Sequence, residues 1–258
     1  MSVQTLADAL WEAEVSRVPI DALSDTDPTL TITDAYAIQS VNTERRRAAG
    51  GVIRGRKIGL TSLPMQRLLG VDEPDYGVIF DDMILDEDQP VDATTLLQPK
   101  VEGEIAFVLA KDLVGPNVTV SDVLLATAGL LPALEIVDSR VRDWKIKLVD
   151  TVADNASSAR LVVGGRLTPI EGVDLRLVGM AFYKNGVLTG TGAGAAALGN
   201  PARCVAWLAN KLAAFGGYLA AGDVVLSGAM HTAVDVRAGD HVQARFAHLG
   251  SVHARFTD

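Results

Sequence analysis

Two glutamates spaced two residues apart form the most informative chemical pattern in the sequence. Glu102 and Glu104 lie in the run 100–109, whose alternation of side chains predicts a β-strand. On such a strand both carboxylates and the small Ala106 share one face, with the carboxylates about 7 Å apart along the strand. Like charges at this spacing repel each other unless solvent or a cation separates them. The pattern alone favours a solvated sheet face, and a cation site is the alternative.

A third acid, Glu135, stands in the apolar run 130–137. Burying an isolated carboxylate costs several kcal/mol, so Glu135 is expected to be paired or metal-bound. Three carboxylates without His or Cys make a hard oxygen site, which suits Mg²⁺, Mn²⁺ or Ca²⁺ better than zinc.

Two further residues are candidates for proton transfer. Lys57 is flanked by apolar residues in the β-like run 55–62, where a lowered pKa would let it act as an acid or base. The simpler interpretation is that its ammonium reaches out to water. Asp75 follows Pro74 in a predicted turn, where it is either a base or, by default, a turn cap.

Other motifs fail as sites. The segment 190–194 lacks the glycine spacing of a dinucleotide-binding loop, so it is expected to be a flexible loop or a close backbone approach. All four histidines lie in the last 28 residues, with no serine elbow or zinc-protease spacing nearby. The only cysteine, Cys204, lies on an apolar helix face and is expected in the core.

Composition excludes several classes of protein. The chain has 258 residues, a net charge of −9, and 48% apolar residues, which argues against disorder. One cysteine forms no internal disulfide, and an acidic surface is a poor match for nucleic acid or an anionic membrane. The N-terminus lacks the basic region of a signal peptide, and no run reaches 18 apolar residues. We therefore expect a cytoplasmic protein with no nucleic-acid or membrane partner.

The N-terminal part of the chain has helical periodicity. Leu6, Leu10 and Ala13 recur at helical spacing, and Thr33 is the expected N-cap of a second helix that ends near Gly50. The segment 25–28 between these helices is expected to be a loop.

After residue 50 the pattern changes to short strands. Strand-like runs are 78–80, 104–109, 134–137, 161–163, 177–183, 224–226 and 242–246. Asn185-Gly186 predicts a type I′ hairpin turn, and one long helix starts at Pro201 and stops before Gly216. This order predicts an α+β chain. We expect one catalytic unit, 1–258, with a helical portion 1–50 and a mainly β, metal-binding portion 51–258.

Taken together, these segments resemble the 2-keto-4-pentenoate hydratase family of the fumarylacetoacetate hydrolase superfamily. The resemblance covers nearly the whole chain, in order and at the family's spacing. The matching stretches are Lys57-Ile58-Gly59-Leu60-Thr61-Ser62, Glu73-Pro74-Asp75-Tyr76-Gly77, Glu102-Gly103-Glu104-Ile105-Ala106-Phe107, Glu135-Ile136-Val137-Asp138-Ser139-Arg140, Asp143-Trp144-Lys145-Ile146-Lys147, Val152-Ala153-Asp154-Asn155-Ala156-Ser157, residues 192–199, 205–210 and 249–252.

The resemblance implies a fold in which a mixed β-sheet roll or sandwich holds the site and N-terminal helices pack outside it. It implies a divalent metal, Mg²⁺ or Mn²⁺, bound by Glu102, Glu104 and Glu135. This implication reverses the interpretation of Glu102 and Glu104 as part of a solvated sheet face. It also implies that Lys57 and Asp75 form the acid–base pair. The substrate's oxygens would be contacted by the Ser157 side chain and the backbone N–H of Ile105.

The activity implied by the resemblance is that of a hydro-lyase in the meta-cleavage catabolism of aromatic or steroid rings. Water is added to a small anionic 2-hydroxy-2,4-dienoate to give a 4-hydroxy-2-oxo acid. A homo-oligomer is usual in this family, and association with neighbouring enzymes of the pathway is a further expectation. Residues 62–65 and 227–234 depart from the usual hydratase pattern, and the latter leans toward the sister 4-oxalocrotonate decarboxylases. Decarboxylation is therefore the alternative activity, followed by a non-catalytic metal-binding domain.

Overall fold

Three helices begin the chain, where the periodicity predicts two. In the computed structural model they are α1 (Val3–Ser16), α2 (Leu23–Thr26) and α3 (Ile32–Ala48). The structure describes all 258 residues except the side chains of Leu68 and Leu69. The prediction of Thr33 as N-cap is wrong, because Thr31 caps α3 and forms a reciprocal capping box with Asp34. The expected loop 25–28 is also partly wrong, since Asp25 lies in the single turn of α2.

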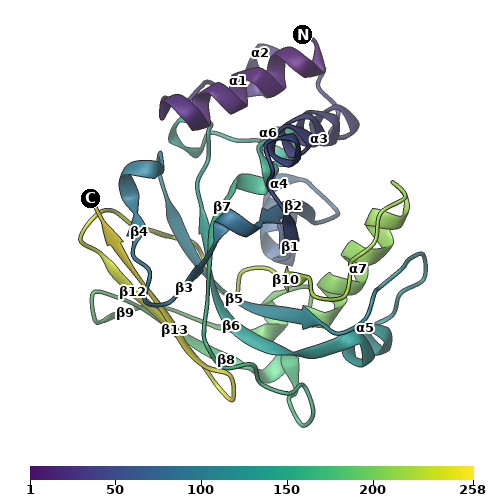
Figure 1. Cartoon of the computed structure of the whole chain (residues 1–258), viewed down its shortest axis with the longest axis vertical. Helices are drawn as coiled ribbons and strands as arrows, with labels where there is room; N and C mark the ends of the chain where they lie inside the picture. Colours follow the sequence, from purple (N-terminus) through teal and green to yellow (C-terminus); the bar gives the residue numbers. More distant parts are fainter.

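The rest of the chain forms two sheets (Figure 1). The larger has the strand order β2-β1-β10-β5-β6-β7-β3, with β11 paired to β5, and the smaller has the order β4-β13-β12-β8-β9. The strands are β1 (Ile53–Gly59), β2 (Asp75–Phe80), β3 (Ile84–Asp86), β4 (Val91–Asp92), β5 (Lys100–Leu109), β6 (Thr127–Val137), β7 (Ser158–Val163), β8 (Gly179–Lys184), β9 (Val187–Ala193), β10 (Val224–Leu226), β11 (Val234–Asp235), β12 (His241–Phe246) and β13 (Gly250–Thr257).

Four more α-helices are interspersed with the strands, namely α4 (Leu63–Leu69), α5 (Val120–Ala126), α6 (Leu148–Ala153) and α7 (Pro201–Ala213). Single 3₁₀ turns lie at Asp81–Met83, Ala93–Thr95, Arg142–Trp144, Asn155–Ser157, Leu175–Leu177 and Gly194–Ala196. Helix α3 packs on α1 and α6, and α7 packs on α5. Figure 1 shows the N-terminal helices gathered at one end of the molecule, beyond β1 and β2. None of the helices described is long and apolar enough to cross a bilayer.

Several predicted elements are confirmed. The Asn185-Gly186 turn joins β8 to β9 with positive φ at both residues, and α7 starts at Pro201 with Cys204 fully buried. The segment 190–194 is not a flexible loop, because most of it belongs to β9. It is a close backbone approach, since a Cβ on Gly192 would stand 2.0 Å from the carbonyl oxygen of Met230. The α+β class is confirmed, while the boundary between portions 1–50 and 51–258 stays a prediction.

The central antiparallel pair β5–β6 sets the register that matters for function. Glu102 lies opposite Glu135, and Glu104 lies opposite Ala133. Strand β10 runs along the other edge of β5 and pairs in parallel with β1, where Leu226 lies opposite Lys57. Residues from four neighbouring strands therefore meet on one face of the larger sheet.

Candidate active site

Three carboxylates converge at the centre of this sheet face. Glu102, Glu104 and Glu135 each offer an oxygen, and these oxygens lie within 4.8 Å of one another. Glu104 and Glu135 are almost completely buried, and Glu102 is partly exposed. The interpretation of the two strand glutamates as a solvated face is therefore wrong for this structure.

The carboxylate oxygens are short of partners. Glu104 Oε1 and both carboxylate oxygens of Glu135 are buried without a hydrogen bond. Burial raises the pKa of Glu102 to about 7, with the neighbouring Glu135 adding to the shift, and burial also raises the pKa values of Glu104 and Glu135. Buried acceptors of this kind need a compensating charge. The three residues thus fit a hard divalent cation, which would take oxygen ligands of this type.

The loop after β10 supports the carboxylates from one side. The backbone N–H of Gly228 donates to Glu104 Oε2 at 2.7 Å. Gly228 has a φ of 105°, and a Cβ there would stand 2.1 Å from the hydroxyl oxygen of Thr61, so only glycine fits. Three residues later, His231 Nε2 accepts a hydrogen bond of 2.9 Å from the N–H of Gly103, between the two strand glutamates.

Lys57 projects from β1 into the same site. Its side chain is 4% exposed, so the interpretation that its ammonium reaches water is wrong. The Nζ atom lies 3.3 Å from Glu135 Oε2 as an ion pair and donates to the carbonyl oxygen of Ala156 at 3.0 Å. Burial alone would lower the pKa of Lys57, but the surrounding carboxylates, led by Glu135, outweigh burial and raise the pKa above its usual range. These carboxylates favour the charged form of Lys57.

Asp75 approaches Lys57 from the neighbouring strand. It is the first residue of β2 and not a turn cap, and it is 2% exposed. Its Oδ1 atom has no hydrogen-bond partner, and burial raises its pKa while the Lys57 ammonium opposes this shift. Asp75 faces Gly59 in the β1–β2 ladder. A Cβ on Gly59 would stand 2.1 Å from Asp75 Oδ1 and 3.3 Å from Lys57 Nζ, so both groups occupy the space above this glycine.

The short turn Asn155–Ser157 closes the site next to Lys57. All three residues have positive φ, at 53°, 50° and 55°, a conformation that costs about 1–2 kcal/mol for each non-glycine residue. Ser157 is 3% exposed, and its hydroxyl lies 3.4 Å from that of Thr151. The contact predicted between Ser157 and the substrate stays a prediction.

Ile105 lies beside Glu104 on β5. Its carbonyl oxygen accepts hydrogen bonds from the backbone N–H and the hydroxyl of Ser227. Because the N–H and C=O of a strand residue point to the same edge, the Ile105 N–H also faces the loop after β10. Its expected role as a donor to the substrate is not tested by this geometry.

The arrangement combines a cation-binding group, a buried ammonium and an unpartnered carboxylate on one apolar sheet face. Such a set can bind a small anion through a metal and move a proton at the bound molecule. Sequence reasoning missed Gly228 and His231, and it gave no role to Arg140 or Asp154, which form a buried ion pair beside the turn 155–157. The only sequence signal for Arg140 and Asp154 was that both lie in stretches that match the family, 135–140 and 152–157.

Comparison with known proteins identifies the family. Residues 61–257 match the family model described as fumarylacetoacetate (FAA) hydrolase C-terminal. The chain belongs to the fumarylacetoacetate hydrolase family. The match excludes only the first 60 residues and the last one, so it contains β2, β5, β6 and the turn 155–157.

Members of this family with curated names resemble the chain along its whole length. The 2-keto-4-pentenoate hydratase of Paraburkholderia xenovorans (strain LB400) is 48% identical, over 97% of this chain and 93% of its own. The 2-hydroxyhexa-2,4-dienoate hydratase of Comamonas testosteroni is 44% identical, over 99% and 98%. The predicted resemblance to the hydratases is confirmed.

A solved structure of the same fold is the 4-oxalocrotonate decarboxylase from Pseudomonas putida G7, complexed with magnesium and adipate. It superimposes with a TM-score of 0.95 and is 40% identical in sequence. The superposition covers 98% of this chain and 97% of the decarboxylase chain. The predicted fumarylacetoacetate hydrolase-type fold, with N-terminal helices outside a mixed-sheet core, is therefore confirmed.

Proposed function

We propose that this chain is a metal-dependent hydro-lyase that adds water to a 2-hydroxy-2,4-dienoate and forms a 4-hydroxy-2-oxo acid. The observation that carries the proposal is the joint presence of the carboxylate cluster and the Lys57–Asp75 pair in a chain 48% identical to a named hydratase. A metal-binding domain without catalysis would need the glutamates alone. The reaction belongs to the breakdown of aromatic or steroid rings by meta-cleavage.

The metal site is proposed to consist of Glu102, Glu104 and Glu135. The buried Glu104 Oε1 and Glu135 Oε1, which have no partner, support a divalent ion at this cluster, and the related decarboxylase holds magnesium. We propose Mg²⁺ or Mn²⁺ as the native ion. When bound by these glutamates, such an ion would supply Lewis acidity and a positive charge that holds the anionic substrate.

Lys57 and Asp75 are proposed to move the protons. Conversion of the dienol to the 2-oxo-3-enoate removes the proton of the 2-hydroxyl group and adds one at C5. Water then adds its hydroxyl at C4 and a proton at C3, so the overall change is the gain of one water. We assign the donor role to Lys57, whose charged form the surrounding carboxylates favour, and the acceptor role to Asp75, whose Oδ1 has no hydrogen-bond partner. The Ser157 hydroxyl and the Ile105 N–H are proposed to orient the substrate's oxygens.

Decarboxylation of a 2-oxo-3-enedioate is the second candidate. It is supported by the decarboxylase fold neighbour and by the unusual segment 227–234, although the named hydratases reach higher identity. Homo-oligomerisation, a cytoplasmic location and association with neighbouring pathway enzymes stay predictions from the resemblance.

One experiment separates the candidates. Metal-loaded protein is incubated with 2-hydroxypenta-2,4-dienoate and, separately, with 2-oxohex-3-enedioate. Loss of dienoate absorbance without release of CO₂ is the expected result. Release of CO₂ from the dicarboxylate, with no hydration of the dienoate, would replace the hydratase by the decarboxylase. Turnover of neither substrate would favour the non-catalytic domain.

A further inference from the structure

The turn Asn155–Ser157 needs an external support. Three consecutive non-glycine residues with positive φ persist only where the surrounding structure over-determines them. This turn presents the Ala156 carbonyl oxygen to Lys57. Whatever fixes the turn therefore also fixes this contact of the proposed proton donor.

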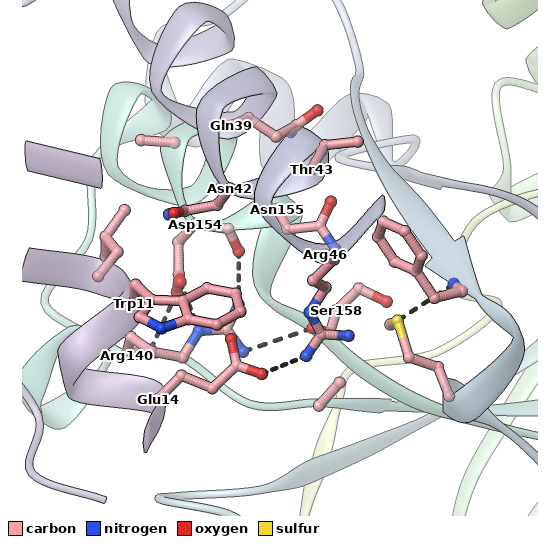
Figure 2. Close-up of a pocket in the computed structure, with 15 residues that line it drawn as sticks. Trp11, Glu14, Gln39, Asn42, Thr43, Arg46, Arg140, Asp154, Asn155 and Ser158 are labelled. Carbon is pink, nitrogen blue, oxygen red and sulfur yellow. Dashed lines mark hydrogen bonds and ion pairs between the residues drawn. The ribbon is translucent and has the colours of Figure 1, made fainter. Parts of the chain in front are cut away.

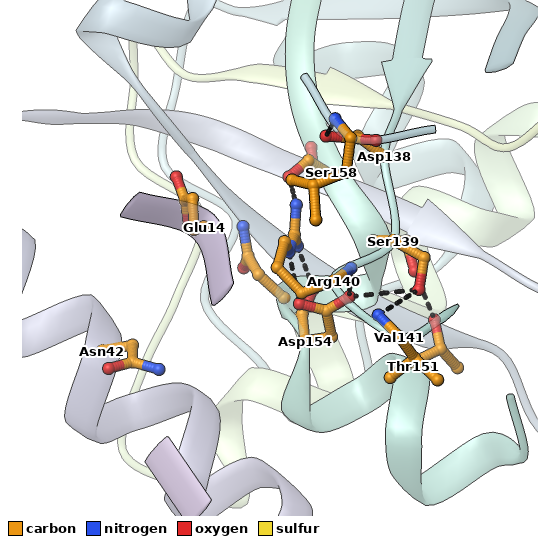
Figure 3. Close-up of polar contacts among 12 residues, drawn as sticks. Glu14, Asn42, Asp138, Ser139, Arg140, Val141, Thr151, Asp154 and Ser158 are labelled. Carbon is orange, nitrogen blue, oxygen red and sulfur yellow. Dashed lines mark hydrogen bonds and ion pairs between the residues drawn. The ribbon is translucent and has the colours of Figure 1, made fainter. Parts of the chain in front are cut away.

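The Arg140 side chain packs against this turn, next to Asp154 and Ser158 (Figure 3). Its Nε donates to Asp154 Oδ1 at 2.5 Å, and its Nη2 donates to the carbonyl oxygen of Asp154 at 2.6 Å. Its Nη1 lies 3.4 Å from the carbonyl oxygen of Ser158. Asp154 and Ser158 are the residues immediately before and after the turn, so one planar guanidinium is hydrogen-bonded to both ends of the turn. A lysine, with a single point of donation, cannot reproduce this fork.

The carboxylate of Asp154 also binds the backbone next to Arg140. Its Oδ2 accepts the backbone N–H of Arg140 at 2.9 Å, and the Ser139 hydroxyl lies 3.5 Å from the same atom. Within the turn, the amide of Asn155 both accepts from and donates to the backbone of Val78 on β2. The turn is thus fastened to the strand that carries Asp75 as well as to Arg140.

The N-terminal helices cover the outer side of Arg140. Figure 2 shows Trp11 and Glu14 of α1 and Arg46 of α3 around a small cavity of about 40 Å³ that Arg140 and Asp154 also line. Glu14 pairs with Arg46 at 2.5 Å. Trp11, Glu14 and Arg46 all precede the part of the chain matched by the family model. The N-terminal portion therefore helps to hold Arg140 in place against Asp154.

We propose that Arg140 is a positioning residue for the reaction, because its guanidinium, closed onto Asp154, keeps the turn 155–157 in register with Lys57. The proposal rests on the proposed function. No hydrogen bond or ion pair among the described residues joins Arg140 to the three glutamates of the metal site. Arg140 should accordingly influence turnover and leave metal affinity unchanged.

The first test is Arg140→Lys, which keeps the buried charge and removes the fork. We expect kcat to fall about 10–100-fold, because small misplacements of reacting groups have effects of this size. The affinity for Mn²⁺, measured by calorimetry, should stay within about twofold, since Arg140 forms no hydrogen bond or ion pair with the three glutamates. The control is Arg142→Lys, whose exposed guanidinium contacts Asp21 and the Pro19 carbonyl and should leave kcat unchanged.

Chemical rescue separates positioning from general stability. Arg140→Ala leaves a space beside the existing cavity, and millimolar methylguanidinium should restore part of kcat, whereas urea at the same concentration should not. Wild-type kcat in folded Arg140→Lys, or an equal loss of Mn²⁺ affinity and kcat without rescue, overturns the proposal. If Arg140→Ala does not fold, the result with Arg140→Lys decides.

A crystal structure of Arg140→Lys gives a readout that does not depend on turnover. The distance from Lys57 Nζ to the Ala156 carbonyl oxygen, 3.0 Å here, should lengthen beyond about 3.5 Å, the limit of a hydrogen bond. An unchanged turn would refute the role of Arg140. If the wild-type protein hydrates no dienoate, the proposed function fails, while this structural comparison still decides whether Arg140 positions the turn.

Discussion

Lys57 and Asp75 are unusual among the ionisable residues because both are buried and face the same glycine. The carboxylates around Lys57 hold it in its charged form, while burial makes the ionised form of Asp75 costly. Both pKa values are raised, so both groups favour their protonated form. The burial of an ammonium and a carboxyl group at one site is the residue-level basis for assigning them the proton transfers.

The variants Lys57→Met and Asp75→Asn should each lower kcat by about 10²–10⁴-fold, the usual contribution of a positioned acid or base. Turnover is followed by the loss of dienoate absorbance at saturating metal. The exposed pair Lys145 and Asp143 provides the matched controls Lys145→Met and Asp143→Asn, which should keep wild-type rates. Folded, metal-binding Lys57 and Asp75 variants with full turnover would remove both residues from the mechanism.

His231 should make stability depend on pH. Burial lowers its pKa to about 4, below the ordinary 6.5, and its neutral Nε2 accepts the N–H of Gly103. The unfolded chain therefore binds more protons than the folded chain between pH 6.5 and 4, so stability falls as the pH falls through this window.

Replacement by Gln removes this titration. In urea unfolding, His231→Gln should reduce the slope of unfolding free energy against pH by up to about one proton between pH 6.5 and 4. The exposed His248 provides the control, and His248→Gln should leave the slope unchanged. An identical slope in the wild type and in His231→Gln would mean that the pKa of His231 is the same in the folded and the unfolded chain.

Among the elements, β1 has the most demanding position, because it carries Lys57 between β2 and β10. Its pairing with β10 is parallel and places Gly55 opposite Val224. A Cβ on Gly55 would stand 1.8 Å from the carbonyl oxygen of Val224. The strand can therefore approach β10 only with glycine at this position.

Gly55→Ala should destabilise the protein by about 1–3 kcal/mol, the usual effect of overpacking, and should lower kcat by displacing Lys57. Chemical denaturation and the dienoate assay measure the two effects. Gly179→Ala in β8 is the control, because a Cβ there meets nothing within 4 Å and should leave both quantities near wild type. A stable, fully active Gly55→Ala protein would show that β1 can shift without disturbing Lys57.

The same strands mark the limit of prediction from sequence. Alternation along β5 correctly placed Glu102 and Glu104 on one face, since that pattern is local. The meeting of Glu102 with Glu135, and the burial of Lys57, depend on which strands pair and in what register, and this is set by long-range packing. The positive φ values of the turn 155–157 have little local signal, because the turn contains no glycine and only Asn155 is of a type that adopts this region readily.

For the molecule as a whole, the net charge of −9 poorly describes the site. Most of the 32 acidic residues are free to be solvated, whereas the carboxylates of the proposed metal site are crowded onto one sheet face, with Glu104 Oε1 and Glu135 Oε1 left without a partner. Their repulsion opposes folding unless a cation is bound, and a cation also attracts an anionic substrate that the rest of the surface repels.

Folding and catalysis should therefore depend on the same ion. Mg²⁺ or Mn²⁺ should bind the folded chain and raise its stability by about 2.7 kcal/mol at a hundredfold excess over Kd, which thermal unfolding with and without EDTA measures. EDTA should also abolish dienoate turnover, and added Mg²⁺ should restore it. Glu104→Gln should lose both responses, because it removes a buried ligand, whereas Glu171→Gln, at an exposed position, should retain them. Full turnover in EDTA, with no change of melting temperature, would contradict a metal-dependent site and leave Lys57 and Asp75 to act alone.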